Sequence, residues 1–254
     1  MIDARIPAAI AVLLALTTAA SADGQTSRAF YCCEAPTWSG VYAGFHAGGA
    51  WADTAWTFPF VETYNTAPGQ HFTTNPQGAI VGGQLGYNHQ FGAFLIGAEI
   101  SFAGSNMTET LRGPVAAAFP DDAFRTHLSD LFTTVARFGL AMDRVMLYGK
   151  AGYANANVDL KANSGSPVPG ITAHTSSHEN GWVIGGGIEY RIMHSLVFGI
   201  DYNYVTLGGD RFTTMTGGAA PGLPLRVDLD DVHIHTVTAR LSILLDRSPT
   251  APTK

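Results

Sequence analysis

Charge, cysteine and long apolar runs are all scarce in this 254-residue sequence. Only 13% of the residues are charged and the net charge is -6, and no basic patch is visible that could hold phosphates, which excludes a nucleic-acid-binding protein. The only two cysteines, Cys32 and Cys33, are adjacent. Neighbouring cysteines pair with each other only under strain, which leaves an intermolecular bond or two free thiols as alternatives.

One apolar run stands at the N-terminus. Arg5 precedes an apolar stretch over residues 6–16, and Ala20-Ser21-Ala22 follows as a small-residue cleavage site. This pattern is typical of a secretory signal peptide over residues 1–22, and a retained membrane helix is the weaker alternative because a span needs about 20 residues. The mature chain is expected to start at Asp23 with a periplasmic segment over residues 23–37.

Residues 182–191 and residues 196–205 alternate with the period of a β-strand, with a short break at residues 192–195. One face is apolar with aromatic ends and the other is small or charged. The apolar face of the first strand carries Trp182, Ile184, Ile188 and Tyr190, and its opposite face carries Gly185, Gly187, Glu189 and Arg191. A soluble sandwich would bury the bulky face beneath a second sheet, whereas a transmembrane barrel turns it to lipid and the small and polar face to the lumen.

The same alternation recurs along the chain. It predicts eight strands, near residues 38–51, 78–89, 94–102, 128–140, 145–153, 182–190, 196–205 and 232–245. Three short turns alternate with four long connections, near residues 52–77, 104–127, 156–179 and 208–231, as in outer-membrane barrels. The prediction is an all-β, eight-stranded, antiparallel, up-and-down transmembrane barrel over residues 38–246. Both termini are expected to be periplasmic and residues 247–254 to form a disordered tail.

Six charged residues share the lumen parity of these strands. They are Glu99, Arg137, Lys150, Glu189, Asp201 and Arg240, with Arg191 near a turn. A charge left on the lipid face near the midplane would cost about 2–4 kcal/mol for Arg or Lys. Because acids and bases balance, we expect an ion network that closes the lumen; the alternative is a narrow ion pathway lined by the same residues.

Four segments of the sequence carry a family resemblance. They read WSGVYAGFHAGGAW, GAIVGGQLGYNHQFGAFLIGAEISF, TTVARFGLAMDRVMLYGKAGYA and GWVIGGGIEYRIMHSLVFGIDYNYV. They resemble the small outer-membrane β-barrel, porin-like surface antigens of alphaproteobacteria, similar in build to OmpA and OmpX. The resemblance implies a multi-pass location in the bacterial outer membrane, assembly by the barrel-insertion machinery, contact with outer-membrane lipid and lipopolysaccharide, and a structural or surface-interaction role. It also implies haem binding in some members.

Histidines gather in or beside the predicted external loops. They are His71, His127, His174, His178, His233 and His235. His233 and His235 share a strand face, and the residues between His174 and His178 give no support for a helix. Imidazole binds both haem and metals, but no spacing here matches a metal motif. We therefore expect solvated histidines and no metal or cofactor, with haem or a metal ion bound at His174, His178, His233 or His235 as the alternative.

An enzyme on the barrel wall is a third hypothesis. His127 and Ser129 share one strand face, as a His-Ser hydrolase would need. Counting back from Arg137 places both residues on the lumen side, away from an acyl substrate, and no GxSxG elbow is present. The sequence therefore predicts a structural barrel without catalysis, which presents four loops to host or environmental ligands.

Overall fold

The computed structural model describes residues 37–58, 70–112, 123–163, 171–209, 211–218 and 221–245. The predicted signal peptide, the cysteine pair and the predicted tail over residues 247–254 lie outside these ranges. Within them, no helix is long and apolar enough to cross a membrane. The strands are β1 (Gly40–Phe58), β2 (Gln70–Thr74), β3 (Gln77–Phe91), β4 (Phe94–Arg112), β5 (Ala123–Met142), β6 (Val145–Asn163), β7 (Ile171–Arg191), β8 (Leu196–Leu207), β9 (Arg211–Met215), β10 (Gly217–Gly218), β11 (Pro224–Leu229) and β12 (Val232–Leu244).

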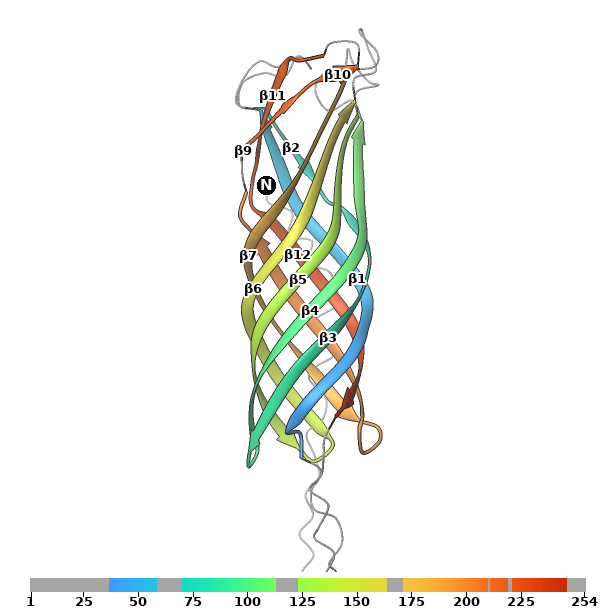
Figure 1. The fold of residues 1–254 in the computed structure, drawn as a ribbon, viewed down its shortest axis with the longest axis vertical. Coiled ribbons are helices and arrows are strands. Elements are labelled where there is room, and N and C mark those ends of the chain that lie inside the picture. The colour runs from blue at the N-terminus through green and yellow to red at the C-terminus, as the bar shows by residue number, and fades with distance from the viewer. Residues whose placement is uncertain are drawn as a thin grey trace, which may run out of the picture. The chain divides into compact units, whose positions relative to one another are not determined.

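Eight of these strands form a closed antiparallel ring. Each strand pairs with its neighbour in the order β1, β3, β4, β5, β6, β7, β8 and β12, and β12 pairs back onto β1 from Tyr42↔Leu244 to Asp53↔His233. The strands cross the barrel at a marked tilt (Figure 1). Because closure leaves no unpaired ring edge, the predicted eight-stranded up-and-down barrel is confirmed.

Short turns join the ring strands at one end of the barrel, called here the turn end. The β3–β4 turn places Gly92 at φ 62°, and the β5–β6 turn places Asp143 at φ 52°. Two-residue hairpins favour such positive φ values, which Gly adopts freely and Asp tolerates. Residues 192–195 join β7 to β8. The opposite end, called the loop end, carries β2, β9, β10 and β11, which pair with β1, with β7 and with one another.

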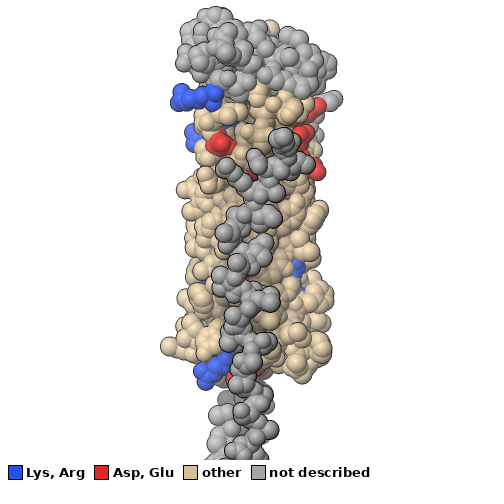
Figure 2. Space-filling model, turned by 180° about the vertical axis from the view of Figure 1, so that it is seen from behind, with Lys and Arg blue, Asp and Glu red and all other residues tan. Residues whose placement is uncertain are grey.

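Apolar side chains cover the outside of the turn-end half. Phe45 is 77% exposed, Phe138 62% and Ile184 52%, while the inward neighbours Arg137 and Val183 are buried. On β1 this face runs from Val41 to Trp51, about 33 Å along the strand and about 25 Å along the barrel at a tilt near 40°. That height matches the apolar band of an outer-membrane barrel. Figure 2 shows the corresponding middle zone almost free of charged residues.

The strands continue past this band, where long loops were expected. β4 reaches Arg112, β5 begins at Ala123, β6 reaches Asn163 and β7 begins at Ile171, so much of the predicted connections 104–127 and 156–179 is strand. β1 likewise extends to Phe58, and β2, β9, β10 and β11 occupy parts of the predicted connections 52–77 and 208–231. Those four predictions of long irregular loops are therefore wrong over these residues.

The polarity of the strands reverses where the apolar band ends. On the outside, β6 changes from Leu147, Ala151 and Tyr153 to Asn157, Asp159 and Lys161; on the inside, it changes from Lys150 to Ala156, Val158 and Leu160. The turn-end half is apolar outside and charged inside, whereas the loop-end half has the polarity of a water-soluble barrel. The sequence prediction assumed apolar side chains that face outward, so it does not extend to this half, where the apolar side chains point inward.

An irregularity in β5 changes which of its side chains face the lumen. Its register with β6 slips between Leu128 and Leu131, and its register with β4 slips at the same level. Leu128 is consequently 1% exposed and points inward, whereas His127 and Ser129 are only partly buried. The prediction that His127 and Ser129 face the lumen is wrong, because one extra residue in a strand turns every following side chain to the opposite face.

Candidate functional site

The barrel interior brings together all six charged residues predicted for the lumen. Glu99, Arg137, Lys150, Glu189, Asp201 and Arg240 come from six strands, β4, β5, β6, β7, β8 and β12, and each is at most 8% exposed. Three carboxylates face three cations, so the formal charge of the group is zero. These six residues are called the lumen network.

Arg137 is fully buried at the centre of the lumen network. One terminal nitrogen, Nη2, donates to Glu189 Oε1 at 2.8 Å, and Nη1 lies 3.3 Å from Glu99 Oε2 and also donates to the Tyr42 hydroxyl. The guanidinium carbon lies 3.9 Å from the centre of the Tyr148 ring. A guanidinium with no solvent contact needs such paired carboxylates and ring faces to offset the loss of hydration.

Glu99 is the acid shared by all three cations of the network. Besides Arg137 it contacts Lys150 Nζ at 3.5 Å and accepts a hydrogen bond from Arg240. Lys150 and Arg240 also converge on Asp201 Oδ2, at 2.7 and 2.8 Å. Because each carboxylate has at least two cationic contacts, the group is a single connected unit rather than three separate pairs.

Tyr42 and Tyr148 complete the network. Both stand at inward-facing positions of the strand alternation, which is the signal in the sequence that could have identified them. The Tyr42 hydroxyl donates to Glu99 at 2.7 Å, and the Tyr148 hydroxyl donates to Asp201 and accepts from Arg240 at 3.1 Å. Tyr148 shares the inward parity of Lys150, two positions away. Glycines supply the space for these rings.

Gly86 and Gly187 show why the inward face needs glycine. A Cβ on Gly86 would overlap the ring of Tyr42. A Cβ on Gly187 would overlap the Asp201 carboxylate and lie 2.8 Å from the Tyr148 hydroxyl. The glycines on the inward face thus leave the space that large side chains of the directly paired neighbouring strands occupy.

A second set of contacts lies toward the turn end. Arg191 donates to the Thr37 carbonyl at 2.6 Å and lies over the Trp38 ring, with its guanidinium carbon 4.6 Å from the ring centre. Trp38 is 1% exposed, and its indole donates to the Asp143 carbonyl at 3.1 Å. Arg191 lies near the turns, as predicted, and it fixes the residues that lead into β1.

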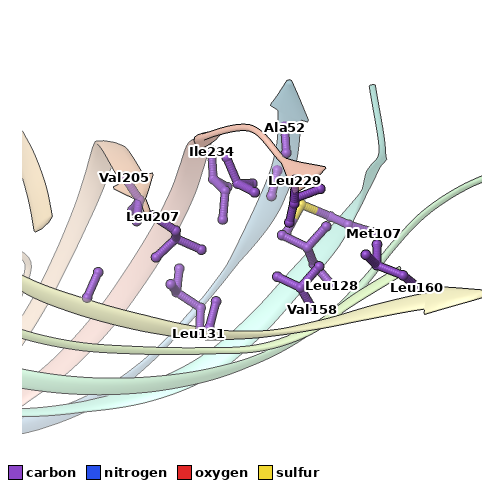
Figure 3. Close-up of a cluster of buried hydrophobic side chains, with 14 of the residues drawn as sticks. Ala52, Met107, Leu128, Leu131, Val158, Leu160, Val205, Leu207, Leu229 and Ile234 are labelled. Atoms are coloured by element: carbon purple, nitrogen blue, oxygen red, sulfur yellow. The ribbon is translucent and has the colours of Figure 1, made fainter. Parts of the chain in front are cut away.

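An apolar cluster fills the lumen on the loop side of the network. Its side chains come from ring strands all around the barrel and from the end of β11, and Figure 3 shows ten of them labelled: Ala52, Met107, Leu128, Leu131, Val158, Leu160, Val205, Leu207, Leu229 and Ile234. Between this cluster and the network lies a cavity of about 30 Å³, lined in part by His46, Thr238 and Arg240. That volume leaves room for a few water molecules.

His233 and His235 lie on the outside of β12, at the loop-side edge of the apolar band. His233 is hydrogen-bonded to the Tyr204 hydroxyl at 3.0 Å and His235 to the Tyr202 hydroxyl at 2.8 Å. The His235 ring also stacks on Trp51, with 5.5 Å between ring centres. The structure therefore places this predicted pair among aromatic side chains of the outer wall.

His174 and His178 project outward from β7, four residues apart. In an extended strand that spacing is about 13 Å, so the two imidazoles cannot share a ligand atom. His174 lies 3.7 Å from an Asp159 oxygen. Within the described ranges, no three His, Cys, Asp or Glu side chains are grouped closely enough to hold a metal ion.

A closed ring with an apolar outer band, aromatic residues at the edge of that band and a paired charge cluster inside defines a transmembrane β-barrel. Comparison with known proteins identifies the family. The model of the outer membrane protein beta-barrel domain matches residues 8–221. The chain belongs to this family, which confirms the predicted location in the bacterial outer membrane.

Relatives agree with this assignment. The chain is 30% identical over 210 residues to the 31 kDa outer-membrane immunogenic protein of Brucella melitensis, covering 80% of this chain and 86% of that protein. The Brucella suis protein of the same name gives the same figures. Among solved structures, the outer membrane protease OmpT of Escherichia coli matches with a TM-score of 0.55 and 10% identity, covering 81% of this chain and 97% of that one. At that identity the likeness concerns the fold alone.

Proposed function

We propose that the protein is a non-conducting outer-membrane barrel that holds a rigid β-walled platform and its loops above the outer surface of the membrane. The observation that carries this proposal is the occupied interior: the lumen network and the apolar cluster follow each other along the barrel with only a small cavity of about 30 Å³ between them. A continuous water path would have to pass the fully buried Arg137. The naming of the Brucella relatives as immunogenic outer-membrane proteins supports a role in surface presentation.

The absence of conductance is directly measurable. Purified protein reconstituted in planar bilayers is expected to give no steady single-channel current, because a narrow pathway lined by Glu99, Arg137 and Lys150 is blocked by ion pairs of 2.7–3.5 Å. Reproducible open channels from the wild-type protein, altered in ion selectivity by Lys150→Gln, would instead establish the narrow-pore alternative.

The orientation is part of the proposal: the loop end faces the exterior and both termini face the periplasm. The chain offers a simple probe, since its lysines are Lys150, Lys161 and Lys254. Lys161 is exposed at the loop end and Lys150 is buried in the lumen. A membrane-impermeant amine reagent added to intact cells is expected to label Lys161 and not Lys254. A Lys161→Arg variant is the matched control, and labelling of Lys254 alone would reverse the orientation.

Haem capture and catalysis are weaker hypotheses for this chain. His233 and His235 are each engaged with a tyrosine hydroxyl, so titration with haem is expected to give the same absorption change for the wild type and for the His233→Ala, His235→Ala double variant. Loss of a Soret shift in the double variant would support haem binding.

His127 and Ser129 do face outward, but the His127 Nδ1 atom is hydrogen-bonded to Thr108 at 2.8 Å. Unchanged lipid A on overexpression is the result expected for a non-enzyme.

Lipid, lipopolysaccharide and the barrel-assembly machinery are the partners that this role requires. The apolar band needs hydrocarbon, and the aromatic side chains at its edge, including Trp51, Trp182 and Tyr204, suit the interface with lipid headgroups. Heat-modifiable mobility of the membrane-extracted protein on gels tests whether this assembly produces the folded barrel.

A further inference from the structure

Three basic side chains line up on the outer wall of the loop-end half. Arg125 of β5 stands directly opposite Lys161 of β6, and Lys161 stands directly opposite His174 of β7. Arg112 of β4 lies diagonally beside Arg125, since Arg125 is paired with Thr110. Arg112, Arg125 and Lys161, called here the basic row, are all exposed. They come from separate strands, so no run of basic residues announces them in the sequence.

Like charges directly opposite each other in a sheet repel, and the basic row has little nearby compensation. Within the described residues, no carboxylate forms an ion pair with Arg112, Arg125 or Lys161. The acid nearest in register is Asp159, two positions from Lys161, and it faces His174 at 3.7 Å. In a chain with a net charge of -6, this arrangement leaves a surface with excess positive charge. Figure 2 shows basic residues at the loop end on one side and most of the acidic ones on the other.

The height of the row above the apolar band indicates where its partner comes from. Lys161 lies eight residues beyond Tyr153, the last aromatic residue of the band on β6. This spacing corresponds to about 26 Å along the strand and about 20 Å along the barrel axis at a tilt near 40°. Because the headgroup layer adds only about 5–7 Å on each side of the hydrocarbon, the row stands clear of the lipid phosphates.

We propose that the basic row is a docking site for a sulfated polysaccharide outside the cell. Adjacent strands are about 4.8 Å apart, so a linear polyanion lying across β4, β5 and β6 would meet a cation on each strand. The two arginines can each make paired hydrogen bonds to a sulfate, and Lys161 adds a compact charge. The outward exposure of this site rests on the orientation proposed above, whereas its affinity does not.

Binding of the full mature chain, held in detergent micelles or nanodiscs, to dextran sulfate tests the proposal, with uncharged dextran as the blank. The wild type is expected to bind with an affinity that falls steeply with salt. The variant Arg112→Gln, Arg125→Gln, Lys161→Gln should bind at least about tenfold more weakly, and the slope of log K against log salt should shrink by about 2, from about 0.7 for each lost contact. Arg144→Gln removes one positive charge at an exposed position of the turn end. It is the control for each single replacement in the row and should bind like the wild type.

Equal loss in Arg144→Gln and in the triple variant, or no loss in the triple variant, would overturn the proposal. It would also be overturned if the basic row bound purified lipopolysaccharide and not dextran sulfate, since the partner would then be the cell's own glycolipid. If the triple variant lacks the heat-dependent mobility of a folded barrel, Lys161→Gln alone is measured, with an expected slope decrease of about 0.7; an unchanged slope contradicts the site. Dextran sulfate binding without surface labelling of Lys161 would refute the orientation but not the site.

Discussion

Removing the charge of Arg137 is the most direct test of the lumen network. In Arg137→Met the chain keeps a long side chain, but Glu189 loses its 2.8 Å partner and Glu99 loses one of three cations. The network changes from neutral to a formal charge of -1 in a region where each of its side chains is at most 8% exposed. Breaking a buried ion pair from one side typically costs about 3–5 kcal/mol, so the free energy of unfolding is expected to fall by that amount. Arg144→Met, at an exposed turn position, should change it by less than about 0.5 kcal/mol.

A second variant separates lost charge balance from lost packing. Glu189→Gln added to Arg137→Met makes the network neutral again, so the double variant is expected to be more stable than Arg137→Met alone. The assay is urea unfolding in lipid vesicles followed by tryptophan fluorescence, with heat-modifiable mobility confirming the folded start. A double variant that loses the sum of both single effects would refute the reasoning, because the destabilisation would then come from packing and not from an unpaired carboxylate.

Further predictions concern the reversal of polarity along the strands and the parity of β5. Ile200→Arg, on the outward face of the apolar band where Ile200 is 49% exposed, should cost about 2–4 kcal/mol in vesicle unfolding; Ser176→Arg, outward in the loop-end half, should be nearly neutral, and equal costs would contradict the assigned boundary. Leu128→Ala should cost about 2–5 kcal/mol because Leu128 is buried in the loop-side cluster, whereas His127→Ala should stay within about 0.5 kcal/mol; the opposite order would show that the parity of β5 is misassigned.

The turn-end half of the barrel could be predicted because lipid imposes a simple rule on it. Apolar side chains must face outward over about ten residues of each strand, and charged ones must face inward. Glu99, Glu189 and Asp201 therefore revealed their side of the wall before any partner was known. The individual contacts could not be predicted, since they depend on how far each strand is shifted along the ring, which no local pattern records.

The loop-end half escaped prediction because water imposes the opposite rule there. Val158 and Leu160 point inward. The apolar residues of β6 therefore move from the odd positions in the lipid-facing half to the even positions here, and the outward apolar pattern that predicts a membrane strand stops. The slip in β5 between Leu128 and Leu131 adds a second displacement. In these extensions the sequence still alternates between polar and apolar residues, but with the apolar residues on the inward face.

The basic row illustrates a different limit. Arg112, Arg125 and Lys161 are separated by 13 and 36 positions in the sequence and meet only because of the pairing of β4, β5 and β6. The sequence contains no run of basic residues, and this remains true. A charged surface made by residues of several strands becomes visible only when the pairing register of those strands is known.

The reversal of polarity at the edge of the apolar band also fixes how deeply the molecule sits. Sinking by one pair of residues would carry Asn155 and Asn180 into hydrocarbon, and rising by the same step would expose the lower edge of the apolar band to water. Both displacements cost free energy, so the depth of the barrel in the membrane is fixed. Whatever attaches to its upper wall is held at a constant distance from the bilayer, and mechanical load applied there is transmitted straight to the ring of paired strands.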